Sequence, residues 1–110
     1  MRQGEIWEIY LNSVKGSEQS GNRPGVVISG NLLNKHLQVV IICPLTTKIK
    51  NYKGNVILEP NTRNGLSEPS ETLIFHIRSV SKARLKKKIG AISTSELNQI
   101  KQGLDDILRY

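Results

Sequence analysis

The sequence has few of the residues on which several protein classes depend. Only one of the 110 residues is cysteine, and aromatic residues make up 5% of the chain. Because a single cysteine, Cys43, cannot form an internal disulfide, we expect a protein of a reducing compartment such as the cytoplasm. No apolar run approaches the ~18–20 residues that cross a bilayer. The opening residues MRQGEIWEIY contain no signal-peptide core, so we predict neither a membrane span nor export.

Motifs for metal binding, nucleotide binding and covalent catalysis are also missing. There is no CxxC or HExxH pattern, and neither of the two histidines has carboxylates at ligand spacing. There is no GxxxxGKS/T, GxGxxG or GxSxG pattern either. These patterns supply metal ligands, phosphate-binding loops and activated serines respectively. We therefore expect no metal site and no cofactor.

The charge balance is strongly basic. Sixteen lysines and arginines against nine acidic residues give a formal net charge of +7 and a pI near 9.8. Such a charge favours a polyanionic partner, such as nucleic acid, an acidic protein or an anionic membrane surface, although it also serves solubility alone. The run Lys86–Lys88 fits either a solvated face or a surface that steers RNA or an acidic partner.

The hydrophobic pattern predicts a single domain, residues 1–110, that is mainly β (α+β). Apolar and β-branched residues alternate or cluster in short segments bounded by turn residues. The expected strands are residues 5–10, 24–29 with Pro24 in first position, 37–45, 56–59, 72–79 and 89–92. In 72–79, Leu73, Phe75 and Ile77 alternate with Ile74, His76 and Arg78. Short helical turns are expected at 31–36 and 82–85, and a polar loop at 12–22.

The clearest helix follows Ser93, which forms a capping-box pattern with Glu96. Apolar residues then recur at helical spacing, and we expect this stripe to pack on the sheet: Leu97, Ile100, Leu104, Ile107 and Leu108. Short strands closed by one amphipathic helix predict a small, strongly bent sheet or barrel.

Two polar residues at strand ends are candidates for chemistry. Arg23 precedes the strand that begins at Pro24, and Thr46 follows the apolar segment 37–45. An arginine and a hydroxyl held on rigid strands of a basic protein suggest phosphate chemistry. RNA is a substrate that so few functional groups could cleave, because its 2′-hydroxyl is the nucleophile and the protein need only assist the attack.

The segments GEIWEIYL, KGSEQSGNRPGVVIS, PLTTKI and HIRSVSKARL, in this order, resemble the MazF/PemK/Kid family of bacterial toxins. These are mRNA-interferase endoribonucleases of type II toxin–antitoxin systems, and the resemblance covers essentially the whole chain. It implies an SH3-like barrel of the CcdB/PemK type, a homodimer and a cognate acidic antitoxin. It also implies metal-independent cleavage of single-stranded RNA at short sequences, leaving a 2′,3′-cyclic phosphate and a 5′-hydroxyl.

The same resemblance assigns roles to individual residues. It makes Arg23 and Thr46 catalytic. Its RNA-binding positions are Glu18, Gln19, Thr47, Lys48, Ser70, His76 and Arg78. Two positions depart from the family pattern: Phe75 stands where plasmid-type toxins carry Asp, and His76 where many members have Gln. We expect Arg23 to hold charge and not to move a proton, since a guanidinium stays protonated at neutral pH.

Two alternatives from other functional classes stay open. A CcdB-like gyrase poison shares this fold and inhibits a protein without cutting RNA. A non-catalytic SH3-like module that binds RNA or protein would use the same basic surface. The group that removes the proton from the 2′-hydroxyl is also left open.

Overall fold

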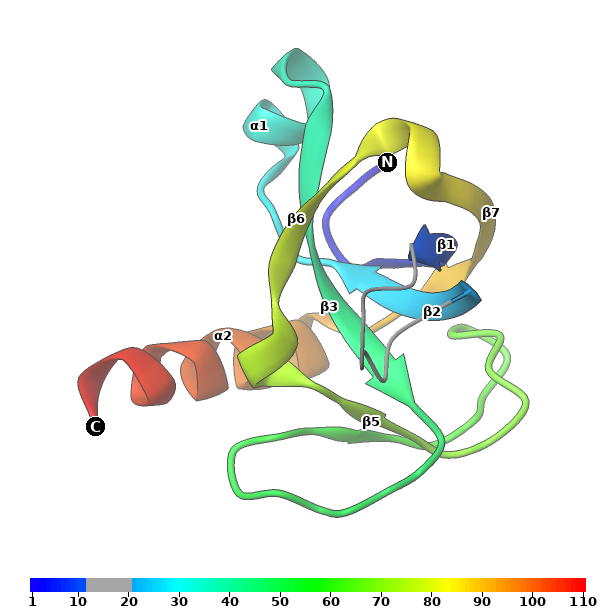
Figure 1. The fold of residues 1–110 in the computed structure, drawn as a ribbon. Coiled ribbons are helices and arrows are strands. Elements are labelled where there is room, and N and C mark those ends of the chain that lie inside the picture. The colour runs from blue at the N-terminus through cyan, green and yellow to red at the C-terminus, as the bar shows by residue number, and fades with distance from the viewer. Residues whose placement is uncertain (12–20) are drawn as a thin grey trace.

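The computed structural model describes residues 1–11 and 21–110 and shows a chain built mainly of short strands (Figure 1). The elements are β1 (Glu5–Leu11), β2 (Gly21–Val27), α1 (Asn31–His36), β3 (Val39–Thr46), β4 (Ile57–Leu58), β5 (Ser70–Thr72), the 3-10 turn η1 (Ile74–His76), β6 (Arg78–Ser81), the 3-10 turn η2 (Lys82–Arg84), β7 (Leu85–Ala91) and α2 (Thr94–Arg109). Most of the expected loop 12–22, with Glu18 and Gln19, lies outside the described residues. Within the described ranges, no helix is both long and apolar enough to span a membrane.

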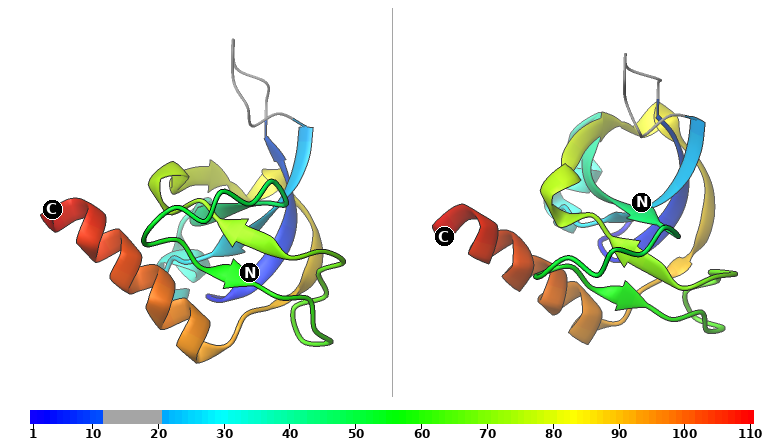
Figure 2. Two further views of the ribbon diagram at one scale, coloured as in Figure 1. Left: turned by 90° about the horizontal axis from the view of Figure 1, so that it is seen from below. Right: turned by 60° about the horizontal axis from the view of Figure 1, so that its bottom comes forward.

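The strands form one antiparallel sheet centred on β3. The strand order is β4-β5-β3-β2-β1-β7, and β6 also pairs with β3. One edge of β3 pairs with β2, while its other edge pairs with β6 along its first half and with β5 at its end. The sheet curls strongly on itself and α2 runs alongside it (Figure 2). This confirms the predicted mainly β fold of the small, SH3-like barrel type.

The sheet buries apolar side chains on both of its faces. Val26 and Val27 are both fully buried, yet they belong to different apolar clusters, because neighbouring side chains of a strand point to opposite faces. Cys43 is also fully buried. Burial raises the pKa of its thiol to about 12, against the opposing effect of a hydrogen bond from the backbone of Leu73. Cys43 therefore serves as a small core residue, since reactive cysteines need a lowered pKa.

Helix α2 begins as predicted and ends differently. The Ser93 hydroxyl accepts a hydrogen bond from the Glu96 backbone N–H at 3.1 Å, and the Glu96 carboxylate accepts one from the Ser93 N–H at 2.8 Å. Ile100 is fully buried, but Ile107 is 46% exposed and Leu108 is 78% exposed. The expectation that the whole stripe packs on the sheet is wrong for the last turn, because α2 extends past the rest of the molecule (Figure 1).

The predicted strand over residues 72–79 is wrong, because η1 interrupts it between β5 and β6. Ile74 turns inward, where it is 1% exposed, and its N–H donates to the Asn55 side-chain oxygen at 3.2 Å. The turn rotates Phe75 outward to 55% exposure. Period-two alternation had grouped Phe75 with Leu73, but Leu73 is buried while Phe75 lies at the surface.

Two other predicted boundaries shift. Strand β2 begins at Gly21, so Pro24 lies in its middle, opposite Glu8, and not in its first position. Proline is tolerated there because β2 pairs with β3 only from Gly25 onward, which leaves one edge of the strand without a ladder. Strand β7 begins at Leu85 and not at residue 89, so the exposed lysines 86–88 lie within it.

Glu5 ties the start of β1 to β7. Its carboxylate accepts hydrogen bonds from the Arg2 backbone N–H at 3.0 Å and the Trp7 indole N–H at 2.9 Å, and it lies 3.1 Å from Lys88 Nζ. Burial opposes ionisation of this carboxylate, but the three partners outweigh burial and lower its pKa to about 2. Glu5 therefore stabilises the folded state as an anion.

Candidate active site

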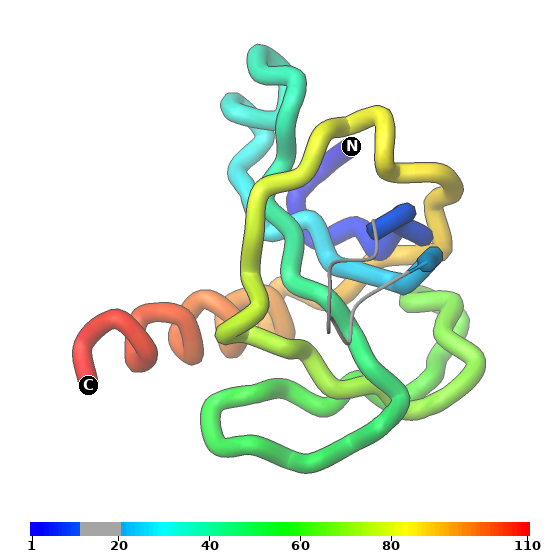
Figure 3. Tube along the Cα trace, in the orientation of Figure 1, coloured from blue at the N-terminus to red at the C-terminus, as the bar shows by residue number. Residues whose placement is uncertain are grey.

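A cavity of about 300 Å³ collects several of the predicted functional residues. It lies where β2, the end of β3 and η1 meet the wide loop between β3 and β4, which Figure 3 traces. The lining residues are Arg23, Thr46, Lys48, Lys50, Tyr52, Leu73, Phe75 and His76. Both predicted catalytic residues are among them, together with the predicted RNA-binding residues Lys48 and His76.

The direction of β2 and β3 explains why Arg23 and Thr46 lie at the same end of the sheet. The last paired positions of β2 and β3 at this end are Gly25 and Pro44. Extending this antiparallel register by two residues along each strand brings Arg23 opposite Thr46. The ladder itself stops before these positions, but both residues lie at this end of the sheet and line the same cavity, although 22 residues separate them in sequence.

A buried carboxylate fixes the loop that forms one wall of the cavity. Glu71 of β5 is fully buried and pairs with Thr46 across the sheet. Its Oε1 accepts hydrogen bonds from the backbone N–H groups of Lys50 at 2.7 Å and Asn51 at 2.9 Å. Its Oε2 accepts from the Tyr52 N–H and the Asn55 side-chain amide, each at 2.8 Å. The loop therefore wraps around one anion.

Hydrogen bonding decides the charge state of Glu71. Burial by itself would raise the pKa of this carboxyl group, because it disfavours the anion. The hydrogen bonds from the Asn55 amide and the loop backbone act in the opposite direction and hold the pKa below its ordinary value. Glu71 is therefore ionised at neutral pH.

Two further contacts join the walls of the cavity. The Asn55 amide donates to Glu71 while its oxygen accepts from the Ile74 N–H, so Asn55 connects the loop to η1. The Thr46 hydroxyl oxygen accepts a hydrogen bond from the Lys48 backbone N–H at 3.1 Å. An accepting hydroxyl keeps its own proton to donate. Thr46 can therefore present that proton to a bound oxyanion.

The cavity is cationic. Arg23, Lys48 and Lys50 line it, and none of the described residues in its lining carries a carboxylate. Glu71 lies behind the wall, where its oxygens are occupied by loop donors. A guanidinium and two ammonium groups around a hydroxyl suit a phosphate or another oxyanion.

Other predicted residues lie outside this lining. Thr47 is exposed on the loop, next to Thr46. Ser70 is 2% exposed and its hydroxyl donates to the Glu68 carbonyl at 3.1 Å. Arg78 is exposed on β6, where it pairs with Ile42.

Sequence reasoning did not select Lys50 and Tyr52, and it missed Glu71 altogether. A usable signal existed for the first two, because the segment KIKNY places lysines and a tyrosine directly after the candidates Thr46 and Thr47. Basic residues interleaved with aromatic ones are typical of nucleic-acid-binding segments. Glu71 gives no such signal, because its partners are mostly backbone groups about 20 residues away.

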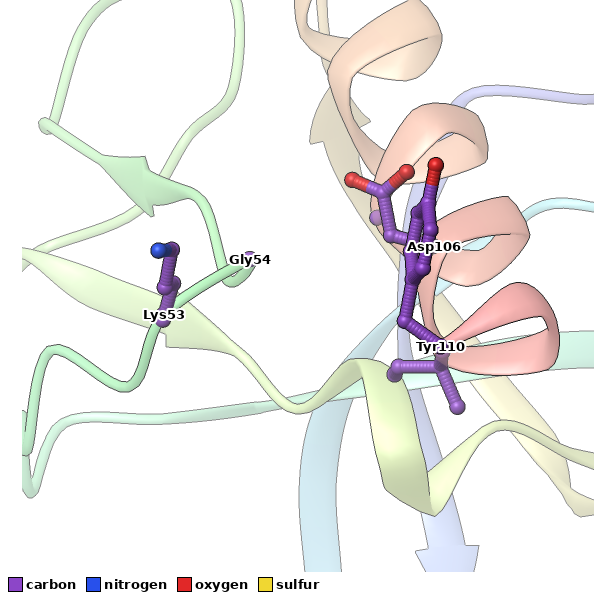
Figure 4. Close-up of a pocket in the computed structure, with 6 residues that line it drawn as sticks. Lys53, Gly54, Asp106 and Tyr110 are labelled. Atoms are coloured by element: carbon purple, nitrogen blue, oxygen red, sulfur yellow. The ribbon is translucent and has the colours of Figure 1, made fainter.

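A second cavity, of about 500 Å³, lies between the loop and the end of α2 (Figure 4). Lys53 and Asp106 approach it from opposite sides (Figure 4). Its other lining residues are Gly54, Gly103, Ile107 and Tyr110. Gly103 brings the helix against the loop, since a Cβ atom there would lie 2.6 Å from the Gly54 carbonyl oxygen. This cavity lacks the concentration of cations and hydroxyls found around Arg23.

In residues 1–11 and 21–110, no group of His, Cys, Asp and Glu side chains is arranged to hold a metal ion.

Comparisons with known sequences give a consistent result. A family profile described as "PemK-like, MazF-like toxin of type II toxin-antitoxin system" matches residues 2–108. A protein named Endoribonuclease MazF9, from Mycobacterium tuberculosis, is 36% identical over 110 positions, covering 94% of this chain and 92% of the relative. Endoribonuclease MazF of Staphylococcus saprophyticus is 32% identical over 106 positions, covering 96% and 88% respectively.

Solved structures share the fold. MazF from Deinococcus radiodurans superposes with a TM-score of 0.83 at 24% identity, covering 100% of this chain and 97% of that one. A MazE–MazF crystal structure from the same organism gives a TM-score of 0.80 at 26% identity, with 98% and 95% covered.

Proposed function

Because the chain belongs to the PemK-like, MazF-like toxin family of type II toxin–antitoxin systems, we propose that it is an endoribonuclease that cuts single-stranded mRNA at short sequences. The observation that carries this proposal is that Arg23 and Thr46 line the same cationic cavity. The relatives named endoribonuclease support it over a gyrase poison or a non-catalytic binding module.

In the proposed reaction the RNA supplies the nucleophile. The 2′-oxygen attacks the adjacent phosphorus and loses its proton, while the bond from phosphorus to the 5′-oxygen breaks and that oxygen gains a proton. The products are a 2′,3′-cyclic phosphate and a 5′-hydroxyl. The step balances without metal, cofactor or protein nucleophile.

The protein's part is to position the phosphate and stabilise its extra negative charge. The Arg23 guanidinium binds non-bridging oxygens in its two-pronged geometry and remains charged throughout. The Thr46 hydroxyl donates to the same phosphate, with its oxygen oriented by the Lys48 N–H. Lys48 and Lys50 add positive charge. His76 is the lining residue equipped for proton transfer, because imidazole is the side chain that most often performs it in enzymes.

We propose three further features of the biological setting. The protein acts in the bacterial cytoplasm, where mRNA is found. It forms a homodimer, which the apolar residues left exposed on the last turn of α2 would favour. A cognate antitoxin inhibits it, as a MazE–MazF complex of a 26% identical relative supports. The net charge of +7 favours an acidic antitoxin segment over the RNA-binding surface.

The test compares Arg23→Ala with wild type on a mixed-sequence single-stranded RNA. We expect kcat/KM to fall by about 100-fold or more, as for loss of a group that stabilises transition-state charge, with an unchanged circular dichroism spectrum. Arg2→Ala is the matched control, because Arg2 is exposed near the opposite end of β2 and should leave cleavage unchanged.

Two results would overturn the proposal. Purified wild-type protein that cuts no RNA would remove the nuclease function, and Arg23→Ala at the wild-type rate would remove Arg23 from the mechanism. End-group analysis tests the chemistry. We expect a cyclic phosphate, and no cleavage when the scissile nucleotide carries 2′-deoxyribose. Cleavage of the deoxy substrate would contradict attack by the 2′-hydroxyl.

A further inference from the structure

Three ring side chains that line the Arg23 cavity contact one another in series. Tyr52 is 49% exposed and Phe75 is 55% exposed, although aromatic residues of this size are usually more buried. Their rings meet edge to face, with centroids 5.7 Å apart and planes at 64°. The His76 ring lies 5.0 Å from Phe75 at 45°. We call Tyr52, Phe75 and His76 the aromatic ledge.

The backbone is anchored at both Tyr52 and Phe75, the two exposed residues of the aromatic ledge. Tyr52 belongs to the loop wrapped around Glu71, to which its N–H donates at 2.8 Å. Phe75 is the middle residue of η1, and the burial of its neighbour Ile74 at 1% exposure anchors that turn in the core. The backbone that carries Tyr52 and the backbone that carries Phe75 are thus both anchored, and Asn55 joins the two anchors.

The ledge and the cations share one lining. Arg23, Lys48 and Lys50 line the same cavity as the three rings. Cations that follow a phosphate backbone, next to ring faces on which bases stack, are the combination that binds single-stranded nucleic acid. A base in a duplex cannot reach such a ledge, because it is already paired and stacked. The position of the ledge is thus suited to an unpaired base beside a phosphate bound at Arg23.

We propose that the aromatic ledge stacks one nucleobase that flanks the scissile phosphate, with Phe75 as the main contact. The proposal rests on the RNA-cleaving function proposed above and adds how the substrate is held. Stacking does not require a particular base, because every base has a π-face. At the flanking position, the protein should tolerate exchange of one base for another and should discriminate against removal of the base.

The experiment uses a short RNA with one mapped cleavage site. A 2′-O-methyl group at the scissile nucleotide blocks cleavage and lets binding be measured by fluorescence anisotropy. Abasic spacers then replace the flanking bases one at a time. For wild type, we expect one spacer position to weaken binding by about 5- to 150-fold, the range for loss of one stacked base. Exchanging the base at that position should have a much smaller effect.

The variant Phe75→Leu removes the ring and keeps an apolar side chain at an exposed site. We expect it to bind intact RNA about 5- to 150-fold more weakly and to lose its sensitivity to the abasic spacer. Phe75→Tyr restores the ring and should recover both properties. Leu32→Ala, at a 76% exposed position on α1, is the control that should behave as wild type.

The outcomes separate this inference from the function on which it rests. If wild type cuts RNA and Phe75→Leu binds intact and abasic RNA as wild type does, the ledge does not stack a base and the nuclease function survives. If Phe75→Leu weakens binding but keeps full sensitivity to every spacer, its effect is structural and the inference is wrong. If wild type cuts no RNA, the proposed function itself fails.

Discussion

Replacing Glu71 with glutamine should strongly destabilise the protein, because the Glu71 carboxylate is fully buried among hydrogen-bond donors. The four donors divide into two pairs, with Lys50 and Asn51 N–H on one oxygen and Tyr52 N–H and the Asn55 amide on the other. Glutamine keeps one oxygen and turns an NH₂ group toward the other pair. Whichever way the amide is oriented, two donors lose their acceptor and face another donor.

The magnitude follows from those two lost contacts. A hydrogen bond to a charged acceptor contributes about 1.5–3 kcal/mol, and an unsatisfied buried donor costs about 1–3 kcal/mol. The loop residues are themselves exposed, so water can reach part of the released backbone. We therefore expect a loss of about 2–4 kcal/mol. That is a large part of the roughly 5–15 kcal/mol that a domain of this size has.

Urea denaturation of Glu71→Gln against wild type measures this loss as a lower free energy of unfolding. Glu68→Gln is the matched control, because Glu68 is an exposed carboxylate three residues earlier and should change stability by less than about 0.5 kcal/mol. A Glu71→Gln protein as stable as the Glu68→Gln protein would refute the idea that one anion anchors the loop.

The pH dependence provides a second readout of the same change. The folded state lowers the pKa of Glu71, so its contribution is fully present above the ordinary carboxyl pKa of about 4.3. The contribution is lost as the pH falls through the lowered folded-state value. The wild-type free energy of unfolding should therefore decrease below about pH 4.3, and Glu71→Gln should show a shallower decrease. Equal slopes for the two proteins would contradict the lowered pKa.

Two other changes test the packing of α2 and the β1–β7 contact. Gly103→Ala should lower the free energy of unfolding by about 1–2 kcal/mol, measured by urea titration. Overpacking against the Gly54 carbonyl should outweigh the better helix propensity of alanine. A stabilised variant would show that the helix moves aside freely. Glu5→Gln should lower the free energy of unfolding by about 1–2 kcal/mol at pH 7. The difference in this free energy between variant and wild type should disappear as the pH falls toward the folded-state pKa of Glu5, about 2. A difference that stays constant over this pH range would mean that the charge of Glu5 does not contribute to stability.

Local signals in the sequence predicted the parts of the fold that depend on neighbouring residues. The capping box of Ser93 and Glu96 lies within four residues, and it starts α2 where expected. The Arg23 motif and the apolar segment 37–45 before Thr46 identified two residues that line the same cavity.

The failures came from contacts between distant residues. The segment 72–79 alternates like a strand, but the hydrogen bond from Ile74 to Asn55 and the core position of Ile74 favour a 3-10 turn. Glu71 could not be selected, because an isolated glutamate in a sequence does not reveal which backbone groups will surround it. The last turn of α2 depends on where the sheet ends, which helical spacing does not encode.

The anchoring of the loop around Glu71 has a consequence for how this scaffold can diversify. Three of its four donors are backbone N–H groups, which every residue except proline possesses. The side chains at Lys50 and Tyr52 can therefore be exchanged without loosening the loop that carries them. Such a scaffold separates the conformation of its binding surface from the chemistry displayed there. Substitutions at these two positions can change the charge and the ring chemistry of the cavity lining at little cost in folding.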